Sequence, residues 1–237
     1  MSGHSKWSTI KHKKAIQDNK RGQIFTKLGK AIAIAAREGG VEVESNFKLR
    51  LAVDKAKQFN MPKMNIERAI EKGGGVGAEG GLDQAVYEGF GPGKVAVIVE
   101  VVTDNKNRSV TEIKKVFEKN GGVMGQPGAV AFMFDRVGLI LVEKSQDGES
   151  QQLAIIDMDV EDVQLSEHGV EVRVGHHKLS EVRHAIEAAG YKVLEADLTY
   201  LPKAEMDVDQ ETREKIDMFV EELEDHDDVH NVFTNLN

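Results

Sequence analysis

Apolar residues recur at helical spacing in the first third of the chain. Between residues 23 and 37 they fall every three or four positions, and Gly39-Gly40 ends the run. A second run of this kind covers 49–59. A third follows Pro62, whose missing N–H costs nothing in the first turn of a helix. The pattern predicts three helices, followed by a flexible glycine-rich linker at 73–81.

After the linker the pattern changes to short strands that alternate with helices. Residues 95–103 are dense in β-branched side chains, which favour a strand. The apolar spacing then predicts helices around 110–117, 153–156, 179–189 and 216–223, and strands at 129–134, 137–143, 170–174, 192–200 and 229–234, with another near Val163. Strands and helices mixed in this way favour an α+β fold with helices on one face of each sheet.

The order of these elements predicts a multidomain protein. The last helix and strand make a poor domain alone, because they need a sheet to pack on. Residues 82–135 supply strands but only one helix, so the simplest arrangement packs the last helix and strand of the chain against them. The expected domains are a basic helical domain at 1–77, an α+β domain made of 82–135 plus 206–237, and an inserted ferredoxin-like α+β domain at 136–205.

The composition narrows the class of protein. There is no cysteine, which excludes disulfides and thiolate metal sites and suits a reducing compartment. No apolar run approaches the roughly 20 residues that a membrane-spanning helix needs, and the N-terminus lacks the apolar core of a secretory signal. We therefore expect a cytoplasmic protein without a membrane partner.

Charge is strongly separated along the chain. The whole protein has a formal net charge of −9, yet the part up to Lys72 carries +9 and the remainder −18. A basic segment with an aromatic ring can neutralise phosphates and stack on a base. The candidate nucleic-acid-binding residues are His4, Lys6, Trp7, Lys11, His12, Lys13, Lys14, Lys20, Arg21, Lys27 and Lys30.

Two simpler interpretations of the basic segment are less favoured. A charged run is often a solvated tail, but this one contains Trp7 and leads directly into an apolar helix. A membrane-surface helix needs a broad apolar face, which Ser5–Asn19 lacks. A nucleic acid is therefore the expected partner.

Two polar or glycine-rich stretches have both a structural and a functional interpretation. Residues 104–109 form a turn and helix cap with Asn107 or Ser109 as the acceptor, or a contact surface in which Lys106 and Arg108 meet an anion. Residues 121–128 are a flexible connector, or a projecting finger tipped by Met124 and Gln126. We take these four side chains as a possible secondary contact with nucleic acid.

The chain lacks a recognisable catalytic centre. Residues 88–94 resemble a phosphate loop but fail its spacing, so a tight turn into a sheet is the better interpretation. His226, Asp228 and His230 could bind a metal in a hydrolase, yet an acidic solvated helix end explains them more simply. We expect no enzyme activity, no metal, no cofactor and no small-molecule substrate. A protein-interaction adaptor is a further alternative.

Several motifs together resemble one family. They are Gly3–Trp7, Lys11–Ala15, Asp18–Lys27, Ala52–Ala56, Tyr87–Gly93, Asp104–Arg108 and Leu201-Pro202. The sequence resembles YebC/PmpR-type proteins over nearly its whole length, and the opening motif is highly specific. Lys106 stands where the family often has arginine, and Ser109 where it often has threonine.

The resemblance implies a helical N-terminal domain and two α+β domains, the last inserted in the other. The family carries the label of probable transcriptional regulators, and some members are credited with DNA binding. Mitochondrial relatives resemble translational activators, and bacterial relatives resemble ribosome-associated factors that relieve stalled translation. The resemblance implies no enzyme.

The expected function is that of a nucleic-acid-binding regulator of gene expression. In the first version it is a transcriptional regulator that binds DNA through the basic N-terminal domain. In the alternative it is a translation factor that binds ribosomal RNA and ribosomal proteins. The resemblance favours DNA. The residues favour RNA, because no helix begins with clustered base-reading side chains and an acidic body would be repelled by a long duplex.

Overall fold

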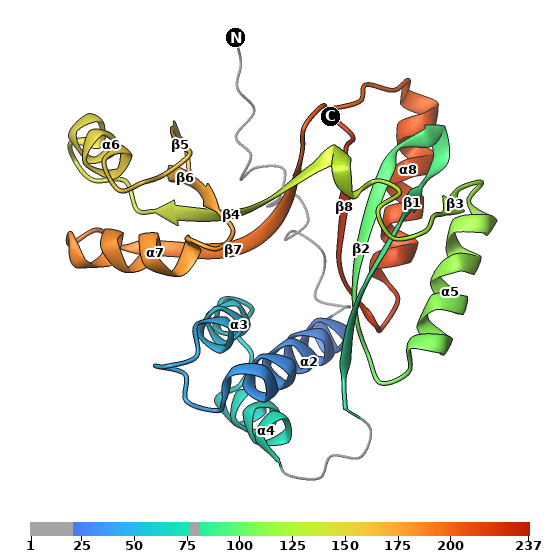
Figure 1. Cartoon of the computed structure of the whole chain (residues 1–237), viewed down its shortest axis with the longest axis horizontal. Helices are drawn as coiled ribbons and strands as arrows, with labels where there is room; N and C mark the ends of the chain where they lie inside the picture. The colour runs from blue at the N-terminus through green and yellow to red at the C-terminus, as the bar shows by residue number, and fades with distance from the viewer. Residues whose placement is uncertain (1–20, 76–80) are drawn as a thin grey trace. The chain divides into compact units, whose positions relative to one another are not determined.

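The computed structural model describes residues 21–75 and 81–237 (Figure 1). They form two compact units. The smaller unit holds residues 136–199, and the larger unit holds 22–135 together with 200–237. The elements are helices and two four-stranded antiparallel sheets, which confirms the predicted α+β class. The predicted three-domain boundaries stay a prediction.

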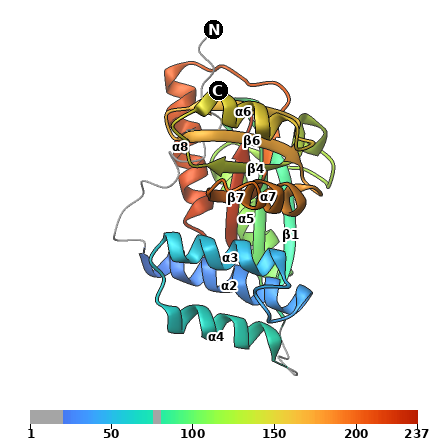
Figure 2. The same ribbon diagram turned by 90° about the vertical axis from the view of Figure 1, so that its left-hand side faces the viewer.

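The first helices lie where the apolar spacing predicts them. They are α2 (Arg21–Gly39), α3 (Phe47–Gln58) and α4 (Lys63–Gly74), and they pack side by side (Figure 2). Ile32 and Leu49 are fully buried between them. Burying one apolar stripe from each helix is what stabilises helices of this length.

Asn46 fixes the turn between α2 and α3. Its side-chain oxygen accepts from the Leu49 N–H at 3.1 Å and so caps α3. Its amide nitrogen donates to the carbonyl groups of Ala35 and Gly40, both at 2.7 Å. Gly40 has φ +91°, which glycine adopts without strain. One buried side chain therefore joins the end of one helix to the start of the next.

The first sheet belongs to the larger unit and has the order β3-β1-β2-β8. Its strands are β1 (Asp83–Phe90), β2 (Ala96–Thr103), β3 (Val123–Met124) and β8 (Val229–Thr234). β8, from the end of the chain, pairs with β2. Helices α5 (Lys106–Lys119) and α8 (Gln210–Glu224) lie together on one face (Figure 1).

The core under these helices is apolar and tightly packed. Val97 and Val99 of β2 point into it, opposite Phe117 of α5 and Phe219 of α8, and all four side chains are fully buried. The two phenylalanine rings meet edge to face with centroids 5.0 Å apart. This geometry is favourable for aromatic pairs and fixes α5 beside α8.

Around this sheet, one predicted strand is wrong and the strand β1 was missed. Residues 131–133 form a turn of 3-10 helix where the apolar pattern predicted a strand over 129–134. β1 was not predicted, because its polar residues and Gly89 mask the alternation. The turn predicted before β2 is present at Pro92–Lys94, with Gly93 at φ +65°.

The second sheet belongs to the smaller unit and has the order β5-β6-β4-β7. Its element order is strand, helix, strand, strand, helix, strand, as in the split β-α-β motif. The elements are β4 (Phe134–Val142), α6 (Gly148–Ile156), β5 (Asp162–Ser166), β6 (Gly169–Gly175), α7 (Leu179–Ala188) and β7 (Val193–Pro202). Ile140, Ile155, Val172 and Ile186 are fully buried in it. Over the described ranges, no helix is long and apolar enough to cross a bilayer.

Candidate nucleic-acid interface

An open cleft of about 870 Å³ lies within the larger unit, among α2, α4, the start of α5 and the loop that joins α8 to β8. The helices contribute a basic wall of Lys30, Arg68 and Lys72, together with Gln23 and Thr26. The α5 end and the α8–β8 loop contribute an acidic wall of Asp104, Glu112, Asp225 and Asp227. The cleft therefore presents cations and carboxylates from different elements.

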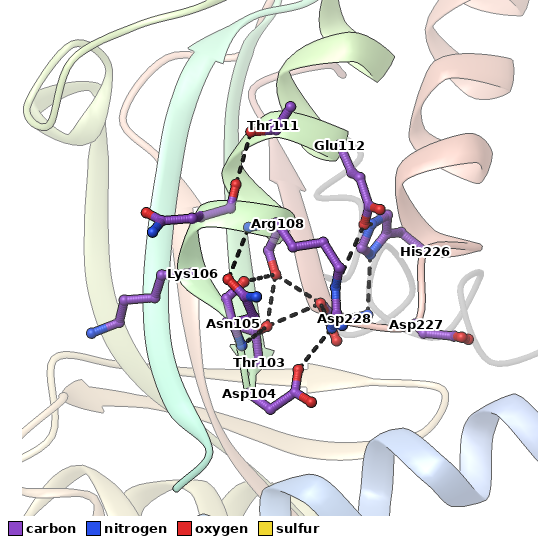
Figure 3. A network of polar contacts seen from close by, with 12 residues as sticks. Thr103, Asp104, Asn105, Lys106, Arg108, Thr111, Glu112, His226, Asp227 and Asp228 are labelled. Atoms are coloured by element: carbon purple, nitrogen blue, oxygen red, sulfur yellow. Dashed lines mark hydrogen bonds and ion pairs between the residues drawn. The ribbon is translucent and has the colours of Figure 1, made fainter. Parts of the chain in front are cut away.

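The buried carboxylate of Asp228 organises the region between the two walls (Figure 3). Its side chain is 3% exposed. Oδ1 accepts from Lys30 Nζ at 2.7 Å. Oδ2 accepts from Ser109 Oγ at 2.7 Å, Thr103 Oγ1 at 3.0 Å and Arg108 Nη2 at 3.1 Å. One carboxylate thus joins α2, the end of β2 and the first turn of α5.

These donors decide the charge state of Asp228. Burial by itself raises the pKa of this carboxyl, but the hydrogen bonds from Lys30, Ser109 and Arg108 outweigh burial and hold the pKa well below its ordinary range. Asp228 is therefore ionised throughout the physiological pH range, and the attraction to its two cations is permanent.

The start of α5 differs slightly from the sequence prediction. The helix begins at Lys106, and Asn105 is its N-cap, whose side-chain oxygen accepts from the Arg108 N–H at 3.1 Å. Asn107 and Ser109, the predicted caps, lie inside the helix. Ser109 is instead fully buried and directed at Asp228. The cap chemistry was predicted correctly and its position was not, because three polar residues in this stretch suit a cap equally.

Two of the predicted nucleic-acid contacts bond to the protein itself. Lys30 Nζ donates to Asp228 and also to the carbonyl oxygen of Asp227 at 3.0 Å. The Lys27 ammonium group donates to the carbonyl oxygen of Glu224. Burial lowers the pKa of Lys27, although nearby acidic residues, Glu224 first among them, oppose the shift. Lys27 and Lys30 therefore hold α2 against the α8–β8 loop.

The other predicted contacts are spread over the chain. Arg21 is exposed at the start of α2. Lys106 forms an ion pair with Asp83 at 3.5 Å, and both side chains are about half exposed. The remaining candidates of the basic segment lie outside the described residues: His4, Lys6, Trp7, Lys11, His12, Lys13, Lys14 and Lys20.

The glycine-rich loop 121–128 is held by an internal anion. The Glu88 carboxylate accepts from the N–H groups of Gly128 at 2.7 Å, Val130 at 2.8 Å and Ala131 at 2.7 Å. Burial raises the pKa of Glu88, but these three bonds outweigh it and lower the pKa below its usual value. The loop is consequently tied down close to its C-terminal end.

The predicted tip of this loop is partly wrong. Met124 lies in β3, pairs with Gly89 and packs against the core of the first sheet, so it is not at a tip. Gln126 and Pro127 are exposed. The part of the loop that faces solvent is therefore the short segment around these two residues.

The histidine and aspartate residues near the end of the chain have protein partners. His226 Nε2 lies 2.9 Å from Glu112 Oε2, and Asp228 is engaged as described above. Within the described ranges, no three His, Cys, Asp or Glu side chains gather as a metal site. These residues serve the polar network beside the cleft.

Sequence reasoning missed most of the cleft. Arg68 and Lys72 lie four positions apart on α4, and this spacing alone would have placed them on one helix face. The acidic wall could not be found in the same way, because Asp104 and Asp225 are brought together only by the fold.

Comparisons with known proteins agree over the whole chain. The family model described as the TACO1/YebC protein N-terminal domain matches residues 5–76, and the model of the TACO1/YebC second and third domain matches 82–236. A probable transcriptional regulatory protein from Caldanaerobacter subterraneus is 47% identical over 100% of this chain and 98% of its own length. One from Trichlorobacter lovleyi is 48% identical over 99% and 95%, respectively.

A solved structure gives the same result at the level of fold. The crystal structure of a conserved hypothetical protein from Aquifex aeolicus superimposes with a TM-score of 0.84 at 40% sequence identity, covering 98% of this chain and 97% of that one. The Caldanaerobacter and Trichlorobacter relatives are named as probable transcriptional regulatory proteins. On these grounds the chain belongs to the TACO1/YebC family.

Proposed function

We propose that this protein is a nucleic-acid-binding regulator of gene expression that binds DNA through its basic N-terminal part. The observation that carries the proposal is the separation of charge: +9 up to Lys72 and −18 beyond it. A polyanion is attracted to the first part and repelled by the second, which orients the encounter. The names of the relatives, probable transcriptional regulatory proteins, support the same assignment.

The helical segment adds to the basic character of the N-terminus. Residues 21–75 hold eleven Lys and Arg against six Asp and Glu. Two of these cations, Lys27 and Lys30, are used internally, while Arg68 and Lys72 are exposed on α4. We infer a cytoplasmic protein that acts by binding, without a catalytic step or a cofactor.

Ribosomal RNA is the second candidate partner, and the glycine-rich loop is the observation that favours it. Glu88 fixes the loop, and Gln126 and Pro127 project from it into solvent in the acidic half of the chain. A promoter-binding protein has no evident use for such a loop, whereas a thin, preorganised backbone suits a crowded RNA site. The acidic remainder would also tolerate basic ribosomal proteins better than a long duplex.

One experiment tests both candidates. The experiment compares the wild-type protein with a variant in which five basic residues are changed to Ala: Lys11, Lys13, Lys14, Lys20 and Arg21. Both proteins are tested in a duplex-DNA shift assay and in co-sedimentation with ribosomes, each over a range of salt concentrations. We expect the slope of log affinity against log salt to fall by about 0.7 to 0.9 for each lost phosphate contact. The control variant changes five lysines of the acidic half to Ala: Lys114, Lys115, Lys119, Lys144 and Lys192.

The results separate the candidates. Binding to DNA alone supports the transcriptional version, and binding to ribosomes alone supports the alternative. If the control variant loses as much affinity as the N-terminal variant, the basic segment is not the binding region. If the wild type binds neither partner, the nucleic-acid function itself is wrong.

A further inference from the structure

We propose that the cleft binds one unpaired nucleotide of a single-stranded nucleic acid, with its phosphate on Arg68 and Lys72 and its base edge on the acidic wall. This inference rests on the proposed nucleic-acid function and makes it more specific. Its charged contacts belong to α4, α5 and the α8–β8 loop, outside the basic segment of the first thirty residues, while neutral residues of α2 line the same cleft.

The basic wall offers two cations that the protein does not use itself. Arg68 and Lys72 are exposed, lie one turn apart on α4 and line the cleft. Within the described ranges, neither side chain has a hydrogen bond or an ion pair. Lys57 and Lys63 of the same helical segment differ, since they pair with Asp54 at 3.9 Å and Glu67 at 3.6 Å. Arg68 and Lys72 are therefore ready to bind a phosphate.

The surroundings of these two cations suit a phosphate. Gln23 and Thr26 of α2 line the same cleft and supply neutral hydrogen-bonding groups. Gly29 leaves open space in the α2 wall, because a side chain built there would meet only the end of Met61 at 3.9 Å. Phe25 also lines the cleft, where it is partly buried against the core of the helical segment and adds apolar surface.

The acidic wall repels a phosphate but suits the donor edge of a base. Asp104 uses Oδ1 for Arg108 at 2.7 Å, and Glu112 uses Oε2 for His226 at 2.9 Å. Over the described residues, no further partner is recorded for the other carboxylate oxygen of either side chain. Asp227 is exposed, and its side chain points away from Asp228 (Figure 3). Such oxygens accept from the exocyclic amino groups of cytosine and adenine.

The two walls together select an unpaired nucleotide. A phosphate is directed to α4 because α5 and the α8–β8 loop are negative, and the base then points toward the carboxylates. In a duplex one hydrogen of each exocyclic amino group is already paired and only the other is offered, in the major groove, whereas an unpaired base presents the whole amino group to the acidic wall. The cleft volume of about 870 Å³ is within the range of small-ligand sites, about 300–1,000 Å³.

The test uses the full chain and fluorescence anisotropy with labelled oligonucleotides of about 12 nucleotides, within the usual site size of single-strand binders. The probes are single-stranded RNA, single-stranded DNA of the same sequence, and the corresponding DNA duplex. Arg68→Gln with Lys72→Gln should weaken single-strand binding about tenfold and lower the salt slope by about 0.7, since the two side chains share one phosphate. Lys57→Gln with Lys63→Gln makes the same change in net charge and should change affinity less than about twofold.

A second measurement addresses the base side. The wild type should bind oligo(C) more tightly than oligo(U), because uracil has no exocyclic amino group. Asp104→Asn with Glu112→Gln should reduce this preference, because a neutral amide oxygen is a weaker acceptor than a carboxylate, while leaving the salt slope unchanged. The RNA and DNA arms show which kind of strand is bound more tightly.

The inference is overturned if the Lys57/Lys63 control loses as much affinity as the Arg68/Lys72 variant. It is also overturned if the Arg68/Lys72 substitutions weaken binding to the duplex and to the single strands equally. The same holds if the wild type shows no preference for oligo(C) over oligo(U). If the Arg68/Lys72 variant binds like wild type while the variant of residues 11–21 loses binding, the proposed function stands and the cleft assignment fails. If the wild type binds none of the probes, the proposed function fails as well.

Discussion

Asp228 shows how one ionised side chain can hold together segments that are distant in sequence. Its donors belong to α2, to the end of β2 and to the first turn of α5. Lys30 is 20% exposed and Arg108 is 46% exposed, so neither cation is fully hydrated when bound. Removing the carboxylate leaves Lys30 without the anion it pairs with and takes one acceptor from two buried hydroxyl groups, while Arg108 keeps its ion pair with Asp104 at 2.7 Å.

Asp228→Asn should therefore lower the free energy of unfolding by about 1–3 kcal/mol at pH 7, the usual cost of orphaned buried donors. Chemical denaturation followed by circular dichroism measures it. The matched control is Asp227→Asn, since Asp227 is exposed and offers its main-chain carbonyl to Lys30. That control should stay within about 0.5 kcal/mol of wild type. Equal effects of the two substitutions would contradict the role given to Asp228.

The same carboxylate predicts a dependence on pH. Because the pKa of Asp228 is lower in the folded protein than in the unfolded chain, its contribution is present above the unfolded value, about 3.9, and is lost as the pH falls toward the folded value. The stability difference between wild type and Asp228→Asn should be constant from about pH 7 to 5 and should shrink below about pH 4. Urea midpoints measured at several pH values check this. A difference that grows on acidification would be inconsistent with a lowered pKa.

At the scale of single residues, sequence reasoning recognised types of chemistry but not pairings. The predicted helix over 23–37, which holds Lys27 and Lys30, is present, but both lysines were predicted only as contacts to nucleic acid. Sequence reasoning could not predict that the main-chain carbonyl of Glu224 and the carboxylate of Asp228, about 200 positions later, would accept their hydrogen bonds. Long-range partners of this kind depend on how the sheet brings the two ends of the chain together, and local spacing carries no information about that.

Among the elements, the loop between α5 and β4 depends on a strand that precedes it by about 40 residues. Glu88 of β1 provides the acceptor for three consecutive or nearly consecutive N–H groups. A charged acceptor makes such bonds stronger than neutral ones. The sequence pattern predicted a flexible connector or a finger, and the structure has a loop with an anchored base.

Glu88→Gln should release this anchor, because an amide has one acceptor oxygen and presents an N–H₂ group to the remaining donors. We expect faster amide hydrogen exchange at Gly128, Val130 and Ala131, with little change in the buried strand β2. Exchange followed by NMR measures each amide separately. Glu100→Gln is the control, since Glu100 accepts from the Asn231 side chain and lies on the neighbouring strand. If exchange is unchanged in Glu88→Gln, the loop is held by something else.

The spacing of apolar residues predicted most of the helices and strands but failed where buried polar residues or glycine interrupt the pattern. The three helices of the first part and the helices α5, α7 and α8 follow their apolar spacing closely. β1 was missed because Glu88 and Gly89 occupy the buried positions that a typical strand would fill with apolar residues. A strand was wrongly predicted at 129–134 because this stretch is apolar. Val130 and Phe134 are indeed buried, but the backbone between them forms a turn of 3-10 helix.

For the molecule as a whole, the separation of charge matters more than the net value. A protein with a calculated isoelectric point near 5.4 is negative at neutral pH and is expected to avoid polyanions. Here the positive part is continuous in sequence and the negative part follows it. A polyanion that approaches the basic end meets a local field opposite in sign to that of the whole protein.

The wild-type protein should therefore be retained on a heparin column at pH 7.5 and low salt in spite of its net charge of −9. The salt concentration at elution is the measurement. Changing Lys11, Lys13, Lys14, Lys20 and Arg21 to Ala should let the protein pass through, while both proteins should bind an anion exchanger. Wild-type protein that does not bind heparin would show that the basic end is masked.

The contact between α2 and the α8–β8 loop also has a consequence for synthesis. Lys30 and Asp228 are 198 positions apart, so at the usual rate of translation the lysine leaves the ribosome roughly 10–40 s before its partner. Throughout that interval the basic helix lacks its own counter-ion, and the first sheet lacks its edge strand β8. A chain that stops early keeps Lys27 and Lys30 available to any polyanion nearby. Synthesis of the segment around Asp228 is thus the step at which Lys30 of α2 gains its counter-ion.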